Sequence, residues 1–337
     1  MRVLLTGATG FLGGRLCSAL VHSGHTVRVT VRANSVTSEL PPEVEIANCD
    51  IQDAPALIKA CEGCDAVIHT AALVGSWLPD SSQFITVNVQ GLRNVIDAVK
   101  ANPSVKKLVY TSSFFALGYT DGHIGDEDQV HPGKFISPYE ESKFLADKVA
   151  QEAAAEGVPI VSVYPGVVYG PGKLTAGNSL ALMLIGRFKG QSPGYIGNGA
   201  DKFSFSHVDD VASGHLAAME IGRGGGRYLL CGDNASYVEI YDLAASLTHT
   251  KPPSFHIPFW VLELAGHITV MWAHFSFATG ISKSLPTLTS NAVQILKHEW
   301  AYSSAKAERE LGYKSRPLKE GLSELLAWLK ATGRITY

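Results

Sequence analysis

Short apolar runs recur along the first half of the chain, separated by longer stretches in which apolar residues return every three or four positions. The short runs have the length of buried strands, and the longer stretches have helical periodicity. The predicted strands are Arg2–Thr6, Thr26–Val31, Val44–Asn48, Ala66–Thr70, Lys107–Thr111 and Ile160–Tyr164. The clearest predicted helices are Phe84–Asn102 and Tyr139–Glu156. Because parallel strands need crossover connections, this alternation predicts an α/β fold, a Rossmann-type doubly wound parallel sheet with helices on both faces.

The second half of the chain is less regular and mostly helical in its pattern. Strands at Phe203–Phe205 and Tyr228–Cys231, with a helix at Val208–Ile221 between them, could rejoin the sheet. Further predicted helices are Asn178–Lys189, Glu239–Leu247, Pro258–Ala278, Thr289–His298, Ser303–Leu311 and Leu318–Ala331. We therefore expect a dinucleotide-binding domain over 1–170 that is rejoined by about 203–232, a smaller helical cap over about 171–202 and 233–317, and a C-terminal helix within 318–337. The cap should cover the carboxyl ends of the strands, where ligands bind in such sheets.

Composition and charge narrow the class of protein. With 337 residues, 46% of them hydrophobic and 18% charged, the chain is typical of a globular protein with a large core. A net charge of −3 offers no basic face to a nucleic acid, so no nucleic-acid partner is expected. Five scattered cysteines predict neither disulfides nor a metal site, because the Cys61–Cys64 pair has no second pair to complete it. We expect no signal peptide and a cytoplasmic protein, as a monomer or a homodimer.

Three glycines stand directly after the first strand and at the start of the first helix. Gly7, Gly10 and Gly13 lie three positions apart in TGATGFLG. A backbone without side chains can turn tightly there and bring a pyrophosphate to the free N–H groups of the helix N-terminus. This placement predicts a dinucleotide site, with Thr9, Phe11 and Leu12 completing the turn.

The end of the second strand bears on the choice of nicotinamide cofactor. An acidic residue there would accept hydrogen bonds from the adenosine ribose and favour NAD, but the chain has Arg32 at this place, nineteen residues past Gly13. An arginine can pair with a 2′-phosphate, so the residue favours NADP over NAD without excluding NAD. Asp50, after the third strand, is expected at the adenine edge.

Tyr-x-x-x-Lys occurs three times, and the sequence context separates the three copies. The copies are Tyr139/Lys143, Tyr169/Lys173 and Tyr302/Lys306. Gly-Pro-Gly interrupts the second copy, which cannot form a helical turn, and the third lies beyond the sheet-forming half. Only the first copy opens a long predicted helix, and Ser113 at the end of an earlier strand can reach the same edge of the sheet.

On a helix, residues i and i+4 share a face, so Lys143 should approach Tyr139 while Glu140 and Glu141 turn away. Lowering a phenol pKa from about 10 to about 7 needs roughly 4 kcal/mol. A unit charge about 4 Å away at an effective dielectric near 20 supplies about that amount. We therefore expect Tyr139 to be a base near neutral pH.

Several motifs together resemble the extended short-chain dehydrogenase/reductase family over nearly the whole chain. They are TGATGFLG, the Asp50 position, HTAA at 69–72, YTSS at 110–113, YEESK at 139–143 and PGVVYGPG at 165–172. Within that family the chain is similar to the plant dihydroflavonol-reductase-like branch, and particularly to plant NAD-dependent farnesol dehydrogenases, through GCD, YTSSFFALG, PGYIG, FSFSHVDDV and RYLLCGDNAS.

The resemblance implies a hydride transfer between an alcohol and a nicotinamide. It implies Tyr139 as acid and base, with Lys143 lowering its pKa and binding the nicotinamide ribose. Ser113 would hold the substrate oxygen, although the adjacent Ser112 could act instead, and Asn88 would belong to a proton relay. Further cofactor contacts implied by the resemblance are Ile51, Ala71, Ala72, Thr111, Pro165 and Val168.

The cap is unusually apolar between positions 252 and 282. This stretch contains no lysine or arginine and six large aromatic residues, most of which we expect in the cap core: Phe255, Phe259, Trp260, Trp272, Phe275 and Phe277. An apolar terpenoid, prenyl or sterol-like substrate suits such a cap better than a sugar nucleotide, whose second pyrophosphate needs cations. Glu263 disfavours a membrane span, and contact of 255–281 with a membrane surface, such as the endoplasmic reticulum, stays open.

Three functions compete on this scaffold. The leading one is an alcohol dehydrogenase or carbonyl reductase with an apolar substrate, and a flavonoid-type carbonyl reductase is a close variant of it. A nucleotide-sugar epimerase or dehydratase is the second. A cofactor-sensing protein without catalysis is the third, and Ser113, Tyr139 and Lys143 together argue against it.

Overall fold

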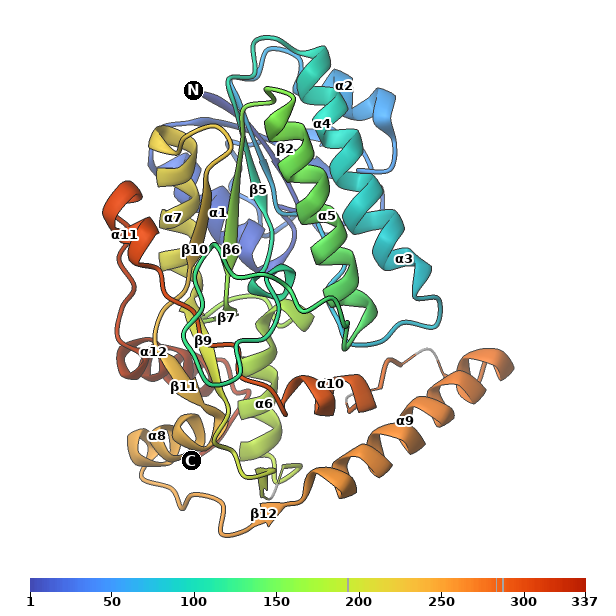
Figure 1. Cartoon of the computed structure of the whole chain (residues 1–337), viewed down its shortest axis with the longest axis vertical. Helices are drawn as coiled ribbons and strands as arrows, with labels where there is room; N and C mark the ends of the chain where they lie inside the picture. The colour runs from blue at the N-terminus through green and yellow to red at the C-terminus, as the bar shows by residue number, and fades with distance from the viewer. Residues whose placement is uncertain (193, 283, 287) are drawn as a thin grey trace.

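A seven-stranded parallel sheet forms the centre of the molecule (Figure 1). The computed structural model describes residues 1–192, 194–282, 284–286 and 288–337. The strand order is β10-β6-β5-β4-β1-β2-β3, so the order reverses between β1 and β4. The strands are β1 (Arg2–Thr6), β2 (Thr26–Val31), β3 (Glu45–Asn48), β4 (Ala66–His69), β5 (Lys107–Thr111), β6 (Ile160–Pro165) and β10 (Arg227–Leu230). The predicted doubly wound α/β fold is confirmed, and its ligand crevice is expected at the carboxyl ends beside this reversal.

Helices cover both faces of this sheet because successive residues of each strand point to opposite sides. Val3 and Leu5 of β1 pack in one apolar cluster and Leu4 in another. The first face carries α1 (Phe11–His22), α7 (Val208–Ile221) and α11 (Ala305–Leu311), and the second carries α2 (Ala54–Cys61), α4 (Gly91–Ala101) and α5 (Pro138–Ala155) (Figure 1). The short helix α3 (Ser82–Phe84) and a π-helical segment (Ile85–Gln90) lead into α4.

A second lobe lies beyond the carboxyl ends of the strands (Figure 1). It contains the three-stranded sheet β11-β9-β7 and the strand pair β8–β12. These strands are β7 (Val167–Tyr169), β8 (Tyr195–Ile196), β9 (Lys202–His207), β11 (Asn234–Ser236) and β12 (His256–Ile257). The helices are α6 (Ser179–Phe188), α8 (Tyr237–Thr248), α9 (Phe259–Thr279), α10 (Ser290–Ile295) and α12 (Leu318–Ala331), with 3₁₀ turns at Phe114–Ala116 and Ala176–Asn178.

The two strands expected to rejoin the main sheet separate in the structure. β10 pairs with β6 and completes the main sheet, as the pattern suggested. β9 instead pairs with β7 and β11, so the expectation for the strand at Phe203–Phe205 is wrong. Phe203 and Phe205 pack against Tyr237 of α8, with ring centroids 5.2 and 5.7 Å apart, and this packing holds β9 in the second lobe.

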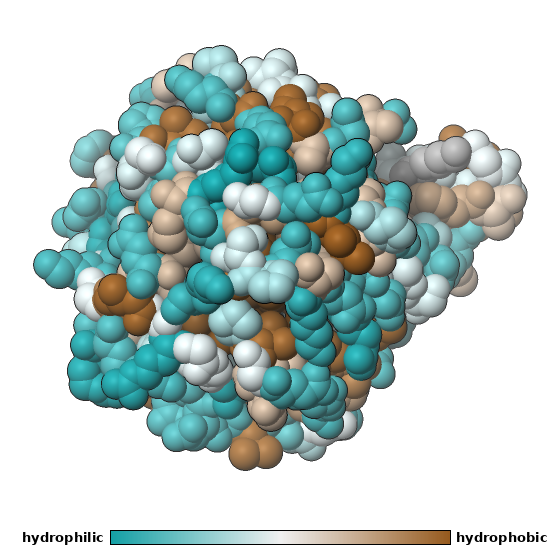
Figure 2. Space-filling view, turned by 90° about the horizontal axis from the view of Figure 1, so that it is seen from above, coloured by the Kyte–Doolittle hydropathy of each residue, from teal (hydrophilic) through white to brown (hydrophobic). Residues whose placement is uncertain are grey.

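Helix α9 extends away from the rest of the molecule (Figure 1), and Figure 2 shows an arm projecting from the body. The expectation that most aromatic residues of this stretch form the cap core is wrong, because four of them are 50–66% exposed: Phe255, Trp260, Trp272 and Phe275. The buried residues of α9 are small ones, Gly266, Ala273 and Ser276. At Gly266 the helix packs closely against α10, because a Cβ atom there would lie 2.7 Å from the backbone nitrogen of Ser290. Among the described helices, none has the length and apolarity needed to cross a bilayer.

Candidate active site

The glycine turn between β1 and α1 leaves room for a bound anion. Gly7 has a φ of +79°, which favours glycine, and its carbonyl accepts a hydrogen bond of 2.9 Å from the Gly10 N–H. A Cβ on Gly13 would lie 2.1 Å from the Gly7 oxygen. The first turn of α1 therefore packs tightly on the strand end, and no side chain caps its N-terminus. These features fit the pyrophosphate of a dinucleotide.

A hollow of about 770 Å³ lies next to this turn, at the ends of β2 and β3. Thr9, Arg32 and Asp50, three of the residues predicted to contact the cofactor, line it together. Its full lining is Thr9, Val31, Arg32, Ala33, Asn34, Ser35, Val36, Asn48, Cys49, Asp50, Asp53 and Lys173. The side chain of Ile51 is not part of this lining and packs against Gly91 of α4 instead. A Cβ atom on Gly91 would lie only 2.7 Å from the Ile51 Cδ1 atom.

The start of α5 brings Tyr139 to the carboxyl edge of the sheet. The Ser137 side chain accepts a 3.2 Å hydrogen bond from the Glu140 N–H, so the helix begins at Pro138 with Tyr139 in its first turn. Glu140 is buried away from the phenol, where its oxygens lie 3.1 Å from His131 Nε2 and 2.6 Å from the Ile136 nitrogen. Glu140 therefore turns away from the phenol, as the i to i+4 argument predicts.

Lys143 lies one turn further along α5 and is almost completely buried, with 3% of its surface exposed. Its Nζ donates a 3.0 Å hydrogen bond to the carbonyl oxygen of Thr111, the last residue of β5. The same Nζ lies 5.5 Å from the centre of the Tyr110 ring. The chain thus fixes this ammonium against the strand end beside which Tyr139 is placed.

The two adjacent serines after β5 have different partners. Within the described residues, the Ser113 hydroxyl is the one polar side chain whose hydrogen-bonding influence lowers the pKa of Tyr139. Ser112 Oγ instead donates to Asp147 Oδ1 at 3.4 Å. Ser113 also accepts from the Phe115 N–H at 3.3 Å, so its hydroxyl is held at the start of a 3₁₀ turn. Of the two candidate hydroxyls, the structure brings Ser113 to the phenol.

The pKa of Tyr139 is raised from its ordinary value, because burial disfavours the phenolate, and the hydrogen-bonding influence of Ser113 only partly opposes this. Burial also lowers the pKa of Lys143 to about 8, with the nearby Asp147 carboxylate acting in the opposite direction. The expectation of an acidified phenol is therefore wrong for this arrangement of protein groups. The cause is desolvation, and the ammonium directs its hydrogen bond to Thr111 rather than to the phenol.

Asn88 lies in the π-helical segment and is fully engaged by its neighbours. Its side chain accepts from the Leu73 N–H at 2.8 Å and donates to the Leu73 carbonyl at 3.0 Å. Its Nδ2 also donates to Ser142 Oγ at 2.9 Å, and that hydroxyl donates to the Tyr139 carbonyl at 2.7 Å. Asn88 therefore connects the loop after β4 to the turn of α5 that carries Tyr139. Ser142 could not be predicted as part of the site, because a serine inside a helix gives no signal of such a link.

The remaining predicted contacts surround the same edge. The Ala71 nitrogen would lie 2.7 Å from a Cβ on Gly7, so the segment with Ala71 and Ala72 presses on the glycine turn. Pro165 ends β6, and Val168 lies in β7.

Two aromatic rings pack against the phenol ring of Tyr139, an arrangement that no sequence pattern indicates. The ring centre of Tyr139 is 6.1 Å from that of Phe84 and 5.8 Å from that of Phe115. Phe115 in turn packs edge-on against Trp300 at 4.5 Å. The partners come from segments far apart in the chain, which periodicity cannot connect. The surroundings of the phenol are therefore apolar.

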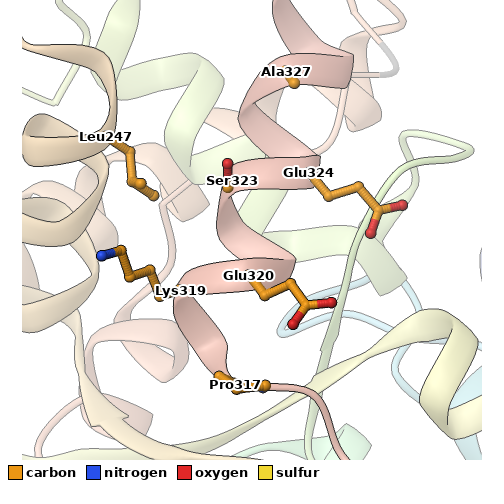
Figure 3. Close-up of a pocket in the computed structure, with 7 residues that line it drawn as sticks. All are labelled: Leu247, Pro317, Lys319, Glu320, Ser323, Glu324 and Ala327. Carbon is orange, nitrogen blue, oxygen red and sulfur yellow. The ribbon is translucent and has the colours of Figure 1, made fainter.

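A second hollow, of about 550 Å³, lies away from the active-site residues, beside α8 and α12 (Figure 3). Leu247 and Lys319 point into the space between the two helices, whereas Glu320 and Glu324 point to the other side of α12 (Figure 3). None of the predicted catalytic or cofactor-binding residues is among the described residues that line this second hollow, so it is not a candidate active site.

Comparison with known proteins gives consistent matches over the whole chain. Residues 3–231 match the NAD dependent epimerase/dehydratase family. A putative dihydroflavonol 4-reductase from Synechocystis sp. is 31% identical and is covered to 95%, with 98% of this chain aligned. Sterol demethylase protein B from Methylococcus capsulatus is 27% identical over 99% of this chain and 100% of its own. The crystal structure of gox2253 superposes with a TM-score of 0.81 at 29% identity, covering 99% of both chains.

Proposed function

Because the chain belongs to the NAD dependent epimerase/dehydratase family, we propose that this NAD(P)-dependent oxidoreductase interconverts an apolar alcohol and its aldehyde or ketone. The observation that carries the proposal is the Tyr139 phenol, which lies one helical turn from the buried Lys143, is influenced by the Ser113 hydroxyl and packs against the rings of Phe84 and Phe115. A cofactor-sensing protein would not need a phenol, a hydroxyl and a buried ammonium collected at one edge.

We assign the proton transfer to Tyr139, whose phenolate oxygen takes the proton of the substrate alcohol during oxidation and whose neutral phenol returns a proton to the carbonyl oxygen during reduction. Ser113 orients the reacting oxygen by hydrogen bonding beside the phenol. Lys143, anchored on the Thr111 carbonyl, contributes positive charge that favours the phenolate. The nicotinamide, when bound, exchanges the hydride and adds its own positive charge in the oxidised form.

For the substrate we propose a terpenoid or prenyl alcohol, or a sterol-like compound, as the farnesol-dehydrogenase resemblance implies. Phe84 and Phe115 beside Tyr139 support an apolar ligand. The two curated relatives named above are described as a dihydroflavonol reductase and a sterol demethylase protein, so a flavonoid-type carbonyl substrate is a close variant. Epimerase or dehydratase action on a nucleotide sugar is the alternative, and the absence of lysine and arginine from 252–282 disfavours it.

For the cofactor we propose NADP in preference to NAD. Arg32 is exposed at the end of β2 and lines the adenosine hollow. A guanidinium there can bind a 2′-phosphate through two parallel hydrogen bonds. We therefore expect Arg32→Ala to weaken NADP binding far more than NAD binding. Equal losses for the two cofactors would remove the basis for this preference.

Turnover by a Tyr139→Phe variant tests the proposed function. Nicotinamide absorbance is followed with terpenoid, sterol and flavonoid alcohols and with UDP- and GDP-sugars, each with NAD and with NADP. The variant should lose at least about 100-fold in kcat and keep its cofactor affinity, because only the proton-transferring hydroxyl is removed. Tyr302→Phe is the matched control, since this tyrosine also begins a Tyr-x-x-x-Lys sequence but donates to the Gly118 carbonyl in the core. Lost cofactor binding with normal single-turnover chemistry would contradict the assignment.

We also propose that the exposed face of α9 contacts a membrane surface, which would give an apolar substrate a short path to the site. The face is formed by large residues at helical spacing: Trp260, Leu264, Ile268, Met271, Trp272 and Phe275, all more than half exposed. The free cysteines suit a reducing compartment such as the cytoplasm, with the endoplasmic reticulum as a candidate membrane.

A further inference from the structure

The second Tyr-x-x-x-Lys sequence has no role in the proton transfer, but it reaches the adenosine hollow. Tyr169 ends β7 in the core, and Lys173 follows in a loop that lines the hollow together with Arg32. The two cations come from β2 and from beyond β7, so the fold rather than the sequence brings them together. Lys173 does not share a helical turn with Tyr169, and it lies instead where a cofactor phosphate is expected.

Glycine geometry fixes the course of this loop. Gly170 and Gly172 both have a φ of 142°, which other residues rarely adopt. A Cβ on Gly172 would lie 3.1 Å from the ring of Phe11, the first residue of α1. The buried Asn178 side chain donates a 3.0 Å hydrogen bond to the Gly170 carbonyl. The loop is thereby held against the start of α1, and Lys173 is directed to the side of the hollow.

The charges in the hollow leave both cations available to an anion. Lys173 Nζ lies 3.5 Å from a carboxylate oxygen of Glu39, a residue whose side chain is 70% exposed. An exposed pair at this distance is weak and gives way to a stronger anion. Within the described residues, Arg32 forms no ion pair. The carboxylates of Asp50 and Asp53 accept hydrogen bonds from the backbone N–H groups of Gln52 and Ala56, at 3.0 Å each.

We propose that Lys173 is the second half of a two-cation site for a phosphomonoester, the 2′-phosphate of NADP, and that Glu39 competes with this phosphate for the lysine. The proposal rests on the cofactor choice made under the proposed function. Arg32 supplies a planar fork of donors, whereas Lys173 supplies a point charge that can follow the phosphate from the opposite segment. A phosphomonoester carries close to two negative charges at neutral pH, so two cations match it.

Calorimetric binding of 2′,5′-ADP and 5′-AMP to the full chain tests this site without any substrate. The two probes differ only in the 2′-phosphate. Lys173→Met should weaken 2′,5′-ADP about tenfold and change 5′-AMP less than about twofold, because one charge-assisted contact to the phosphate is lost. Lys173→Arg should restore most of the affinity. Glu39→Gln should strengthen 2′,5′-ADP about two- to threefold by removing the competitor. Lys314→Met, an exposed lysine outside the hollow, is the matched control.

The outcomes separate this site from the proposed reaction. Equal weakening of both probes in Lys173→Met would overturn the proposal, because the lysine would then contact the 5′-phosphate or the fold. A wild-type protein that binds both probes equally would also overturn it while leaving an NAD-dependent reaction intact, which the turnover assay detects. If Lys173→Met does not fold, an unchanged 2′,5′-ADP affinity in Glu39→Gln overturns the proposed competition.

Discussion

Lys143 is a buried cation whose Nζ donates a hydrogen bond to the Thr111 carbonyl. Burying an ammonium costs free energy, and the fall of its pKa from 10.5 to about 8 measures this cost. Packing gives no reason for a charge at this position, since an apolar side chain of similar length would fill it. The charge therefore needs a reason other than stability, and the chemistry that we propose for the neighbouring phenol supplies one.

This cost leads to a prediction for Lys143→Met. In the wild type the folded state holds the proton less tightly than the unfolded chain, so the unfolded chain binds more protons between pH 8 and 10.5. The penalty is fully present below pH 8 and is relieved as the pH rises toward 10.5. The stability of the variant relative to the wild type should therefore decrease by about 2 kcal/mol between pH 7 and pH 9.5. Urea unfolding of both proteins at the two pH values measures it.

Lys148→Met is the matched control for this measurement. Lys148 lies on the same helix but is exposed, with its Nζ 4.5 Å from the centre of the Phe144 ring. Its substitution should give a pH-independent difference from the wild type. A pH-independent difference for Lys143→Met as well would show that Lys143 is not held as a costly charge.

Helix α5 carries more of the site than its Tyr-x-x-x-Lys sequence. One turn beyond Lys143, Asp147 is buried and accepts from Tyr164 at 2.5 Å and Gln151 at 2.6 Å. Burial raises the pKa of Asp147, with these hydrogen bonds and Arg227 opposing the shift. In its charged form Asp147 raises the pKa of Lys143. The helix thus holds phenol, ammonium and carboxylate in successive turns.

Asp147→Asn should narrow the pH range of activity on its alkaline side. Removing the negative charge lowers the pKa of Lys143 further, so the ammonium is lost at a lower pH. The alkaline limb of kcat against pH should move down by about half a unit to one unit, while kcat near pH 6.5 stays within about threefold. Glu152→Gln, on an exposed turn of the same helix, should leave the profile in place. A lower kcat with an unmoved profile would indicate a purely structural role for Asp147.

Helices and strands that bury one or both of their faces could be predicted from the sequence. Contacts between side chains that are far apart in the chain could not. β2, β5, α7 and α12 have the predicted bounds, because their apolar periodicity is the cause of their burial. α9 was predicted as a helix but with the wrong face buried, since small residues at Gly266 and Ala273 allow closer packing than its aromatic residues do. The Ser113–Tyr139 contact followed from sheet topology, whereas the Asn88–Ser142 link depends on a π-helical segment that no periodicity predicts.

At the scale of the whole molecule, two lobes meet at the carboxyl edge of the main sheet, and each contributes different features. The first lobe contains the glycine turn, the hollow beside it that we propose for adenosine, and the helix with Tyr139, whereas the second contains Trp300 and the arm α9. Glu263 on α9 pairs with Lys297 near α10, so the charge in the arm is turned to the body and its outer face is left apolar. An exposed apolar face of this length is uncommon on a monomer and indicates contact with another apolar surface.

Replacing Trp260, Trp272 and Phe275 together by serine tests whether the outer face of α9 contacts a lipid bilayer. The triple variant should lose at least about tenfold in partitioning to vesicles of neutral and anionic phospholipid, because the aromatic residues supply most of the apolar area on the outer face. Cosedimentation measures partitioning, and tryptophan fluorescence of the wild type should shift to the blue on binding. Serine at Ile124 and Val130, exposed apolar positions elsewhere, is the matched control. Unchanged vesicle binding in the triple variant would contradict a membrane role for the apolar face of α9. A wild-type dimer in sedimentation that is lost in the triple variant would also contradict it, because a second copy of the chain would then cover this face.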